Sequence, residues 1–453
     1  MTSSALRFAG PGAAALLLAA LWPLSAYVAG PAVLPGLLLA GAAVVTIALR
    51  LEVGVVVVLL LAPFTNIAAD AGRPVRFIES GLAVAVLVGA LLVARRDADA
   101  RPRGALPWMV VAFLATGAVS SLWAEEPAES LPRFLGIVAA SALFYAVLVV
   151  CRERPQLRLI VAGAVGSLLL AGLQGTIQKI TGNTSFAGVV IDGQVVGRVA
   201  GSFSHPNQYA GFLICLIPLA VAVLLTRTSG GGVRALAGAA LAFSLAGLAF
   251  SLTRGAVIGL VLGSLVWIAL VRPRLALPLV LVVLLGGAFL VPGALRERLS
   301  DSTGGDLGLR ADLWTAAVDI YSTSPVVGVG LANFSHAYSS LPSQLATGTQ
   351  RRLLHQSQLL VPPHANNLFL TILAEEGLLG ALAFLGLLGA ALWNCRRAAR
   401  RDDPFSRVVG LGLGAGLCAM LVQSLLDFAL LGEPSLPIYA LLGVVTILAA
   451  EPV

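Results

Sequence analysis

Runs of apolar residues, each roughly 17–25 residues long, recur along the whole chain and are separated by short polar stretches. A helix rises 1.5 Å per residue, so each run is long enough to cross a hydrocarbon layer about 30 Å thick. The pattern predicts about fourteen transmembrane helices, and twelve or thirteen remain compatible with it. The expected spans are 9–29, 32–49, 53–69, 78–94, 105–123, 134–151, 158–176, 208–226, 235–252, 255–271, 275–291, 367–393, 408–430 and 435–450.

The composition excludes a large soluble protein. Hydrophobic residues make up 58% of the chain and charged residues 11%, whereas soluble domains carry roughly 25% charged residues. We therefore expect an all-α polytopic membrane protein with about 12–14 transmembrane helices. Residues 1–291 hold the first eleven spans and an outer loop at 177–207, residues 292–366 form a helical extracytoplasmic loop domain, and residues 367–453 hold the remaining spans.

The formal net charge of +7 would suggest nucleic acid as a partner of a soluble protein. In a membrane protein it indicates anionic lipid head groups and the positive-inside bias, and we expect no nucleic-acid partner. With the N-terminus on the cytoplasmic side, most arginines fall in cytoplasmic loops, which fixes the expected orientation. The cytoplasmic arginines are Arg50, Arg95, Arg96, Arg101, Arg103, Arg152, Arg154, Arg158, Arg227, Arg234, Arg272, Arg274, Arg396, Arg397, Arg400, Arg401 and Arg407.

Two outer segments, 178–207 and 292–366, are too long to be simple connections, and long loops in compact proteins are usually functional or disordered. Within the second, residues 306–321 show helical spacing of apolar positions, which predicts a helix. The recurring apolar residues are Leu309, Leu313, Ala317 and Ile320, and the stop and turn residues that follow are Ser324, Pro325, Gly328 and Gly330. An ordered outer domain follows from this pattern.

Three arginines stand out on the outer side. Arg254 is placed between two spans with almost no loop, where a buried arginine costs about 2.5–3.5 kcal/mol; it either snorkels to the head groups or faces an outward-facing cavity. Arg310 lies near the start of the loop helix and opposes its macrodipole, unless it pairs with Asp306 or Asp312. Arg198 ends the first outer loop, as an interfacial anchor or as a functional cation.

His364 is the most distinctive of the four histidines. Pro362-Pro363 stiffen the approach to it, and Asn366-Asn367 supply a good N-cap for the next span. The positive end of that helix would disfavour the imidazolium, leaving a neutral imidazole able to take a proton. A structural histidine remains the alternative.

Other candidates are less specific. Glu375, Glu376 and Asp427 lie within later spans, where they could orient an acceptor, pair with an arginine or remain neutral. The sequence does not decide among these. His336 and His355 are interpreted as ordinary loop residues.

The candidates combine arginines and a histidine on one side of the membrane, without the acidic or His/Asp clusters that hold a metal. We therefore expect no metal and no cofactor. Guanidinium forks match the oxygens of a diphosphate leaving group, and a neutral histidine can deprotonate a hydroxyl acceptor. The set predicts glycosyl transfer from a lipid diphosphate.

Four stretches then carry a resemblance to a known family. They are Arg198-Val-Ala-Gly-Ser-Phe-Ser-His-Pro-Asn207, Ser251-Leu-Thr-Arg254-Gly255-Ala256, Arg310 with Trp314 and the later Ser324-Pro325-Val-Val-Gly328-Val-Gly330, and Pro363-His364-Ala-Asn366-Asn-Leu-Phe-Leu-Thr-Ile-Leu-Ala-Glu375-Glu-Gly377-Leu-Leu-Gly380. Each is loose alone, but their order, spacing and common outer side make the match specific. Over roughly residues 195–435 the chain resembles the O-antigen ligase and polymerase superfamily of bacterial membrane proteins.

The resemblance implies a metal-independent, inverting glycosyltransferase of the bacterial inner membrane, with undecaprenyl diphosphate-linked glycan as donor and its active site on the periplasmic side. Arg254 and Arg310 would bind the diphosphate, and His364 would be the general base or would orient the acceptor hydroxyl. Further positions that fit the resemblance are Arg198, as an additional diphosphate ligand, and Glu375, Asp427, His205 and Asn207 as secondary candidates.

Family members differ in their acceptor, and nothing in the sequence identifies it. Ligases attach a finished glycan to the glycolipid lipid A–core, polymerases extend the glycan on its carrier, and a third group glycosylates proteins. We favour a ligase narrowly over a polymerase. The rival from another class is a transporter or flippase of lipid-linked glycan, although transporters tend to place ionisable residues near mid-membrane and on both sides.

Overall fold

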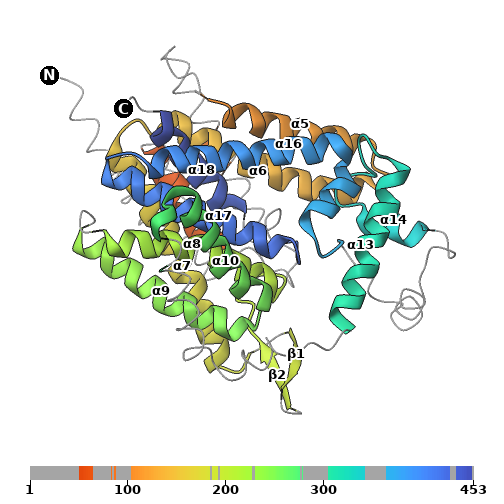
Figure 1. Cartoon of the computed structure of the whole chain (residues 1–453), viewed down its shortest axis with the longest axis horizontal. Helices are drawn as coiled ribbons and strands as arrows, with labels where there is room; N and C mark the ends of the chain where they lie inside the picture. Colours follow the sequence, from red (N-terminus) through yellow and green to blue (C-terminus); the bar gives the residue numbers. More distant parts are fainter. Residues whose placement is uncertain are drawn as a thin grey trace, which may run out of the picture.

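The computed structural model describes residues 50–64, 104–183, 186–191, 194–226, 230–275, 305–341, 364–428 and 435–450, with the separate positions 83, 86, 87 and 278. This part of the chain is a bundle of long helices with one short β-hairpin (Figure 1). Helices α5, α6 and α16 run side by side along one face of the bundle, and α7 to α10 form the other part with α17.

The apolar helices confirm the predicted class, an all-α polytopic membrane protein. Seven described helices are long and apolar enough to cross a membrane, and three apolar helical segments are shorter. The bounds of the long helices are Pro127–Val150 (α6), Arg154–Ile180 (α7), Pro206–Leu225 (α8), Gly231–Ser251 (α9), Arg254–Val271 (α10), Leu368–Ala399 (α16) and Pro404–Ser424 (α17). The shorter segments are Leu51–Leu61 (α3) with the 3-10 turn Ala62–Phe64 (η1), Leu106–Leu122 (α5) and Ser435–Ala450 (α18).

Four predicted spans fall wholly or mostly outside the described residues, namely 9–29, 32–49, 78–94 and 275–291. The total number of transmembrane helices therefore stays a prediction. Most of the described spans begin earlier than predicted, by up to seven residues in α6, which begins at Pro127 instead of residue 134, whereas α5 and α16 begin one residue later. Proline at the first or second helical position explains several early starts, because its fixed φ suits the first turn and its missing N–H is not needed there.

Small residues let the helices approach one another closely. A Cβ added at Gly263 of α10 would lie 2.3 Å from the backbone nitrogen of Ala419 in α17, and one at Gly259 would lie 2.6 Å from the oxygen of the same residue. On another side of α17, a Cβ at Gly416 would overlap the backbone of Cys215 in α8. Such contacts between backbones are typical of helix association in membranes, where burial of apolar surface gives little driving force.

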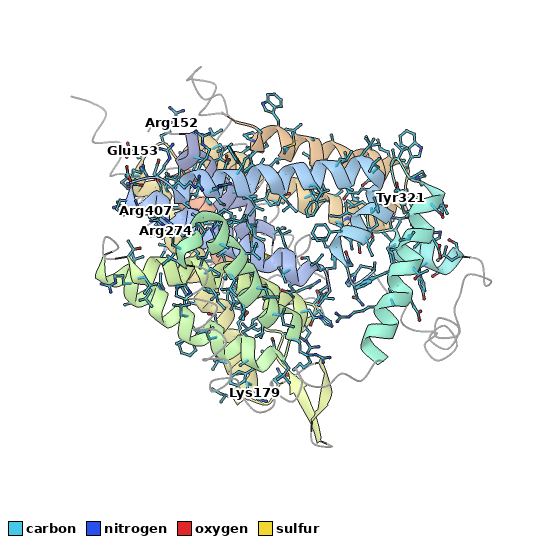
Figure 2. The ribbon with its side chains drawn as sticks, viewed as in Figure 1. Arg152, Glu153, Lys179, Arg274, Tyr321 and Arg407 are labelled. Atoms are coloured by element: carbon cyan, nitrogen blue, oxygen red, sulfur yellow. The ribbon has the colours of Figure 1, made fainter. Side chains whose placement is uncertain are left out.

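The bundle has an arginine-rich end. Figure 2 shows Arg152, Arg274 and Arg407 at one end, with Lys179 and Tyr321 away from it. Asp403 is the N-cap of α17 at this same end, because its carboxylate accepts the backbone N–H of Ser406. These three arginines were all assigned to cytoplasmic loops, and their common position agrees with the positive-inside rule.

The loop at 177–207 contains a β-hairpin that the sequence analysis did not predict. Strands β1 (Phe186–Ile191) and β2 (Gln194–Arg198) are antiparallel, with Ile191 opposite Gln194. In the sequence the strands flank Asp192-Gly193, a dipeptide that favours two-residue hairpin turns between β-branched residues. The hairpin ends at Arg198 and so delivers that arginine to the start of α8.

The loop domain contains two described helices, α13 (Gly305–Thr323) and α14 (Phe334–Ser340), which lie together at one side of the molecule (Figure 1). The predicted helix at 306–321 is confirmed, and its apolar positions Leu313, Ala317 and Ile320 are buried. They pack in a cluster with Phe334 and Tyr338 of α14, which the sequence analysis had assigned to a loop.

Helix α16 is broken at Gly377, whose backbone lies at φ 66° and ψ −164°. The segment that follows α13 docks into this break. Its backbone makes four hydrogen bonds there: Val329 N–H to Ala374 O (3.1 Å), Gly330 N–H to Glu375 O (3.0 Å), Leu378 N–H to Pro325 O (2.9 Å) and Leu379 N–H to Val326 O (3.2 Å). A broken helix at membrane depth is tolerated when other protein groups satisfy its freed backbone, and the loop domain does so here.

Glycines make this docking possible. Gly328 has φ 74°, and a Cβ there would come 2.2 Å from the carbonyl carbon and oxygen of Glu375. Gly377 has φ 66°, and its added Cβ would come 2.4 Å from the carbonyl of Val326. Both positions therefore require glycine for its left-handed backbone and for the close approach.

We expect Gly377→Ala to lower the apparent thermal unfolding temperature of the purified protein. The left-handed backbone alone costs a non-glycine residue about 1–3 kcal/mol, and the new methyl group also overlaps Val326. Gly389→Ala is the matched control, since Gly389 lies in the same helix and its added Cβ meets nothing within 4 Å. Equal unfolding temperatures for the two variants, measured in the same detergent, would contradict the docking.

Candidate functional site

His364 lies just before α16, at the end of the bundle away from the arginine-rich end. Asn366 has a left-handed backbone (φ 50°), and Asn367 caps the helix by accepting the N–H of Leu370 at 3.1 Å, as the sequence predicted. The Nδ1 atom of His364 accepts the backbone N–H of Asn366 at 3.2 Å. The imidazole is thereby fixed to the first residues that lead into the helix.

The His364 side chain keeps some accessible surface, but the protein around it is dense enough to disfavour its charged form. Burial, together with the Arg133 charge and His205, lowers the pKa of His364 to about 4, and burial is the largest of these causes. The sequence analysis expected a neutral imidazole because of the positive end of the helix. The direction is the same in the structure, but the main cause is burial.

An aromatic stack holds the His364 ring. Phe428 stacks on it with ring centroids 5.1 Å apart and planes 19° apart. The guanidinium of Arg133 lies over the Phe428 ring at 4.9 Å. Phe428 is itself positioned by its backbone N–H, which the side chain of Asp427 accepts at 2.7 Å. Residues from α6, from the segment before α16 and from the segment after α17 therefore meet at one point.

His205 repeats the arrangement of His364 at the start of α8. Its Nδ1 accepts the backbone N–H of Asn207, two residues later, at 3.1 Å. Removal from water and, to a smaller extent, the charge of Arg198 together lower the pKa of His205 to about 4. Since His205 also lowers the pKa of His364, the two imidazoles belong to the same site.

Arg198 joins the hairpin, α8 and the turn between α9 and α10. Its Nε donates to the carbonyl oxygen of Ser251 at 2.9 Å, and its Nη2 donates to Asn207 Oδ1 at 2.7 Å and Thr253 Oγ1 at 3.0 Å. Two of its nitrogens are thus used to hold protein groups in place. This contact set brings Arg198 and Asn207, two of the predicted residues, directly together.

Arg254 begins α10 only three residues after α9 ends at Ser251. The chain reverses there through Leu252, which has φ 51°, a left-handed conformation that is strained for leucine by about 1–3 kcal/mol. The predicted near-absence of a loop at Arg254 is confirmed. Because Thr253 contacts Arg198, the half-buried Arg254 starts its helix beside the Arg198 contact set.

Asp427 connects these residues to the loop domain. It is buried and lies after the end of α17, and burial raises its pKa. Four contacts oppose this rise, namely the Phe428 N–H, the Arg310 charge, the Asn207 side chain and the Arg198 charge. Arg310 of α13 therefore acts on the same carboxyl group as Arg198. Through Asp427, three of the predicted residues are linked.

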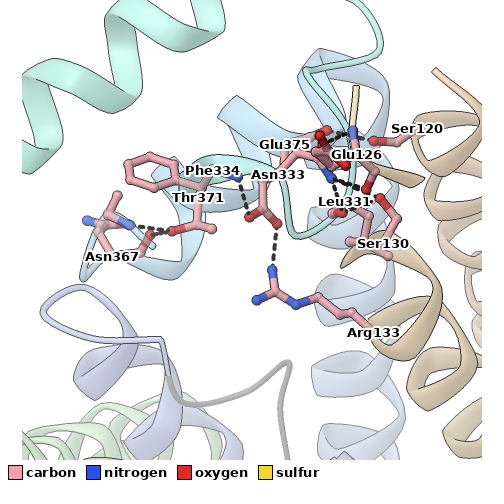
Figure 3. Close-up of polar contacts among 11 residues, drawn as sticks. Ser120, Glu126, Ser130, Arg133, Leu331, Asn333, Phe334, Asn367, Thr371 and Glu375 are labelled. Atoms are coloured by element: carbon pink, nitrogen blue, oxygen red, sulfur yellow. Dashed lines mark hydrogen bonds and ion pairs between the residues drawn. The ribbon is translucent and has the colours of Figure 1, made fainter. Parts of the chain in front are cut away.

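Glu375 occupies the last turn before the break in α16, and Figure 3 shows Arg133 reaching toward it from α6. Arg133 Nη1 lies 2.7 Å from Glu375 Oε2. The backbone oxygen of Glu375 accepts the Ser120 hydroxyl at 2.6 Å, and its side chain accepts the N–H of Phe334 at 3.4 Å. Of the alternatives left open by the sequence, the structure contains the ion pair with an arginine.

Asn333 fastens the loop domain to the start of α6 (Figure 3). Its side-chain amide donates to the Ser130 hydroxyl at 3.0 Å and to the carbonyl oxygen of Leu331 at 3.1 Å, and its oxygen accepts the N–H of Glu126 at 2.8 Å. Since Arg133 lies in the following turn of α6, these bonds fix its position relative to Glu375.

The structure thus links most predicted candidates and adds one. Arg133 was missed because the span was expected to begin at residue 134, which left this arginine among ordinary outer-loop residues. His336, which was interpreted as a loop residue, lies in α14 and contacts Glu125 at 3.0 Å, while His355 lies outside the described residues. Within the described part of the chain, His, Cys, Asp and Glu side chains form no group of three that could hold a metal ion.

The fold and the site define a polytopic membrane protein that gathers arginines and two imidazoles among its helix ends. Residues 239–385 match a family model described as O-antigen ligase, which supports the O-antigen ligase and polymerase superfamily as the family of this chain. The matched segment contains Arg254, Arg310, His364 and Glu375. No curated protein matches the chain.

We expect the folded protein to lose stability as the pH falls below about 6.5, the ordinary pKa of histidine. Both histidines have their pKa lowered to about 4 in the folded protein, so the unfolded chain takes up protons first. At pH 5 the loss should approach about 2 kcal/mol for His364 and be smaller for His205, whose side chain is exposed to solvent that screens the shift. Apparent unfolding temperatures in detergent at pH 7.5 and pH 5 measure it.

The control for this prediction is the variant with His205→Asn and His364→Asn. Asparagine keeps an oxygen that can accept the backbone N–H two residues later, but it does not titrate. The difference in unfolding temperature between pH 7.5 and pH 5 should shrink in this variant. An unchanged difference would show that other groups cause the acid sensitivity.

Proposed function

We propose that this protein is a metal-independent, inverting glycosyltransferase that moves a glycan from undecaprenyl diphosphate to an acceptor hydroxyl on the extracytoplasmic side of a bacterial inner membrane. The coarser statement, a membrane protein of the O-antigen ligase and polymerase type, rests on the family match. The observation that carries the finer proposal is the linkage of Arg310, Arg198 and Asp427 with the His205–His364 pair.

Guanidinium groups supply the positive charge that a diphosphate leaving group needs. We assign this role to Arg254, the first residue of α10, and to Arg310 of α13, whose charge acts on Asp427. Arg198 was expected to bind the diphosphate as well, but two of its nitrogens donate to protein acceptors. Its proposed role is therefore to hold the turn before Arg254 and the side chain of Asn207 in position.

His364 has two possible roles, general base or orientation of the acceptor hydroxyl. Its Nδ1 accepts the N–H of Asn366, so the neutral ring carries its proton on Nε2. That nitrogen is then a hydrogen-bond donor, which supports orientation of the acceptor oxygen over removal of its proton. Asp427, a buried carboxyl group with a raised pKa next to Phe428, is the candidate for the proton acceptor.

The acceptor molecule is proposed to be lipid A–core, which makes the protein a ligase. A polymerase that extends the glycan on its carrier, or an enzyme that glycosylates proteins, would use the same donor site. A flippase would use the arginines as a path for the lipid-linked glycan and would release no undecaprenyl diphosphate. Transfer of the glycan to an acceptor and release of undecaprenyl diphosphate therefore distinguish the enzyme from the transporter.

We expect purified protein to release undecaprenyl diphosphate from a lipid-linked glycan when an acceptor is present. His364→Asn should lower turnover by about 10²–10³, the usual effect of losing one placed donor. His364→Gln should keep part of the activity, because its amide can donate from near the position of Nε2. If both variants lose activity equally, the general-base role is favoured instead.

The control is His336→Gln, since His336 lies in α14, contacts Glu125 and is outside the proposed site. It should retain the turnover of the unmodified protein. If no donor and acceptor pair gives release, while vesicles containing the protein move the lipid-linked glycan across the bilayer, the transferase proposal is wrong and the transporter is right.

Chelation tests the proposed absence of a metal. Because arginine side chains carry the charge neutralisation in this proposal, we expect turnover to be unchanged after treatment with EDTA and dialysis. Restoration of activity by Mg²⁺ or Mn²⁺ after such treatment would contradict it. The same preparation without EDTA is the reference.

A further inference from the structure

Arg133 contacts two parts of the site at once. One nitrogen forms the ion pair with Glu375 at 2.7 Å, and the guanidinium carbon lies over the Phe428 ring, 4.9 Å from its centroid. The His364 ring stacks on the Phe428 ring, and the centroids of the two rings are 5.1 Å apart. The order of groups is therefore Glu375, Arg133, Phe428 and His364, taken from four separate segments of the chain.

Each member of this stack is held by other contacts. Glu375 is fixed by the break in α16 and by the Ser120 hydroxyl bond to its backbone oxygen. Phe428 is fixed by the bond from its N–H to Asp427. The arginine side chain is 22% exposed and the Glu375 side chain 2% exposed, so the pair lies in a largely water-excluded place where its geometry and charge act strongly.

We infer that Arg133 is a positioning residue of the transferase site, which holds the His364 ring in place through Phe428 while Glu375 holds Arg133. The inference rests on the proposed function. A planar guanidinium suits this task because it can stack on an aromatic ring and bind a carboxylate at the same time, which an ammonium group does less well.

Arg133 also affects the charge of His364. Its positive charge opposes protonation of the imidazole, as does His205 from the start of α8. Asp427 lies beside Phe428 on the segment that follows α17. Arg133 therefore keeps His364 neutral at lower pH than burial and His205 would alone.

The experiment removes the charge of Arg133 without leaving a buried carboxylate unpaired. It compares Glu375→Gln with the double variant Arg133→Gln and Glu375→Gln, so that the two differ only at Arg133. The readouts are kcat, KM and the pH profile of undecaprenyl diphosphate release. Relative to Glu375→Gln, the double variant should show a kcat about tenfold or more lower and an acid limb about 0.5–1 pH unit higher.

Arg133→Lys separates charge from stacking. Lysine keeps the positive charge, so the acid limb should stay in place, but it loses the planar contact, so kcat should fall with little change in KM. The matched control is the pair at the arginine-rich end, where Arg154 Nη1 lies 2.8 Å from Asp403 Oδ2. Arg154→Gln with Asp403→Asn should leave kcat and the acid limb unchanged.

The outcomes distinguish the two proposals. If the unmodified protein releases no undecaprenyl diphosphate, the proposed function fails. If it does release undecaprenyl diphosphate, the proposed function stands. The role of Arg133 is then overturned if the double variant matches Glu375→Gln, and Arg133→Lys matches the unmodified protein, in both kcat and the acid limb. A fall in kcat that appears equally in the Arg154 and Asp403 control would also overturn it, because any lost ion pair would then suffice.

Discussion

The break in α16 at Gly377 is the constraint on which the site depends. Backbone groups freed inside a membrane must find partners in the protein, since hydrocarbon offers none. Here the segment after α13 supplies them, through four backbone bonds around residues 374–379. One requirement therefore fixes two things, the shape of α16 and the position of the loop domain against it. Arg310 of α13 is brought to the site by the same docking.

The ion pair of Arg133 with Glu375 follows from the same break. A carboxylate with 2% of its side chain exposed needs a partner, because the cost of removing it from water exceeds what backbone hydrogen bonds restore. Buried pairs of this kind contribute little net stability compared with well-packed apolar groups. Their value here is geometric, because Arg133, Phe428 and His364 take their places from it.

The sequence predicted what depends on local pattern. Apolar length predicted the described helices, and the spacing from Leu313 to Ile320 predicted α13. The N-cap at Asn367 followed from local chemistry as well. The helix break did not, since Gly377 stands in a continuous apolar run and its conformation depends on a segment about fifty residues earlier.

Hydropathy also misplaced helix ends, with consequences for the site. The window excluded the polar first turns of α6, so Arg133 was interpreted as part of a loop, although the helix begins at Pro127. In the opposite sense, Asp427 was placed within a span that ends at Ser424. Polar residues at helix ends lower the hydropathy average although they continue the helix or cap it. In this chain such ends hold Arg133 and Asp427, so hydropathy located the helices better than it located these two residues of the candidate site.

The location of the site at helix ends explains how it combines neutral imidazoles with cations. Each histidine is fixed by a backbone N–H two residues later, from Asn366 or Asn207, in the turn that begins a helix. Burial and a nearby arginine then keep each ring neutral at ordinary pH. In the same place the Glu375 side chain lies 2.7 Å from Arg133, and the charges of Arg310 and Arg198 act on Asp427. Positive charges and uncharged imidazoles stand side by side only when both conditions hold at once, and segments far apart in the sequence provide them.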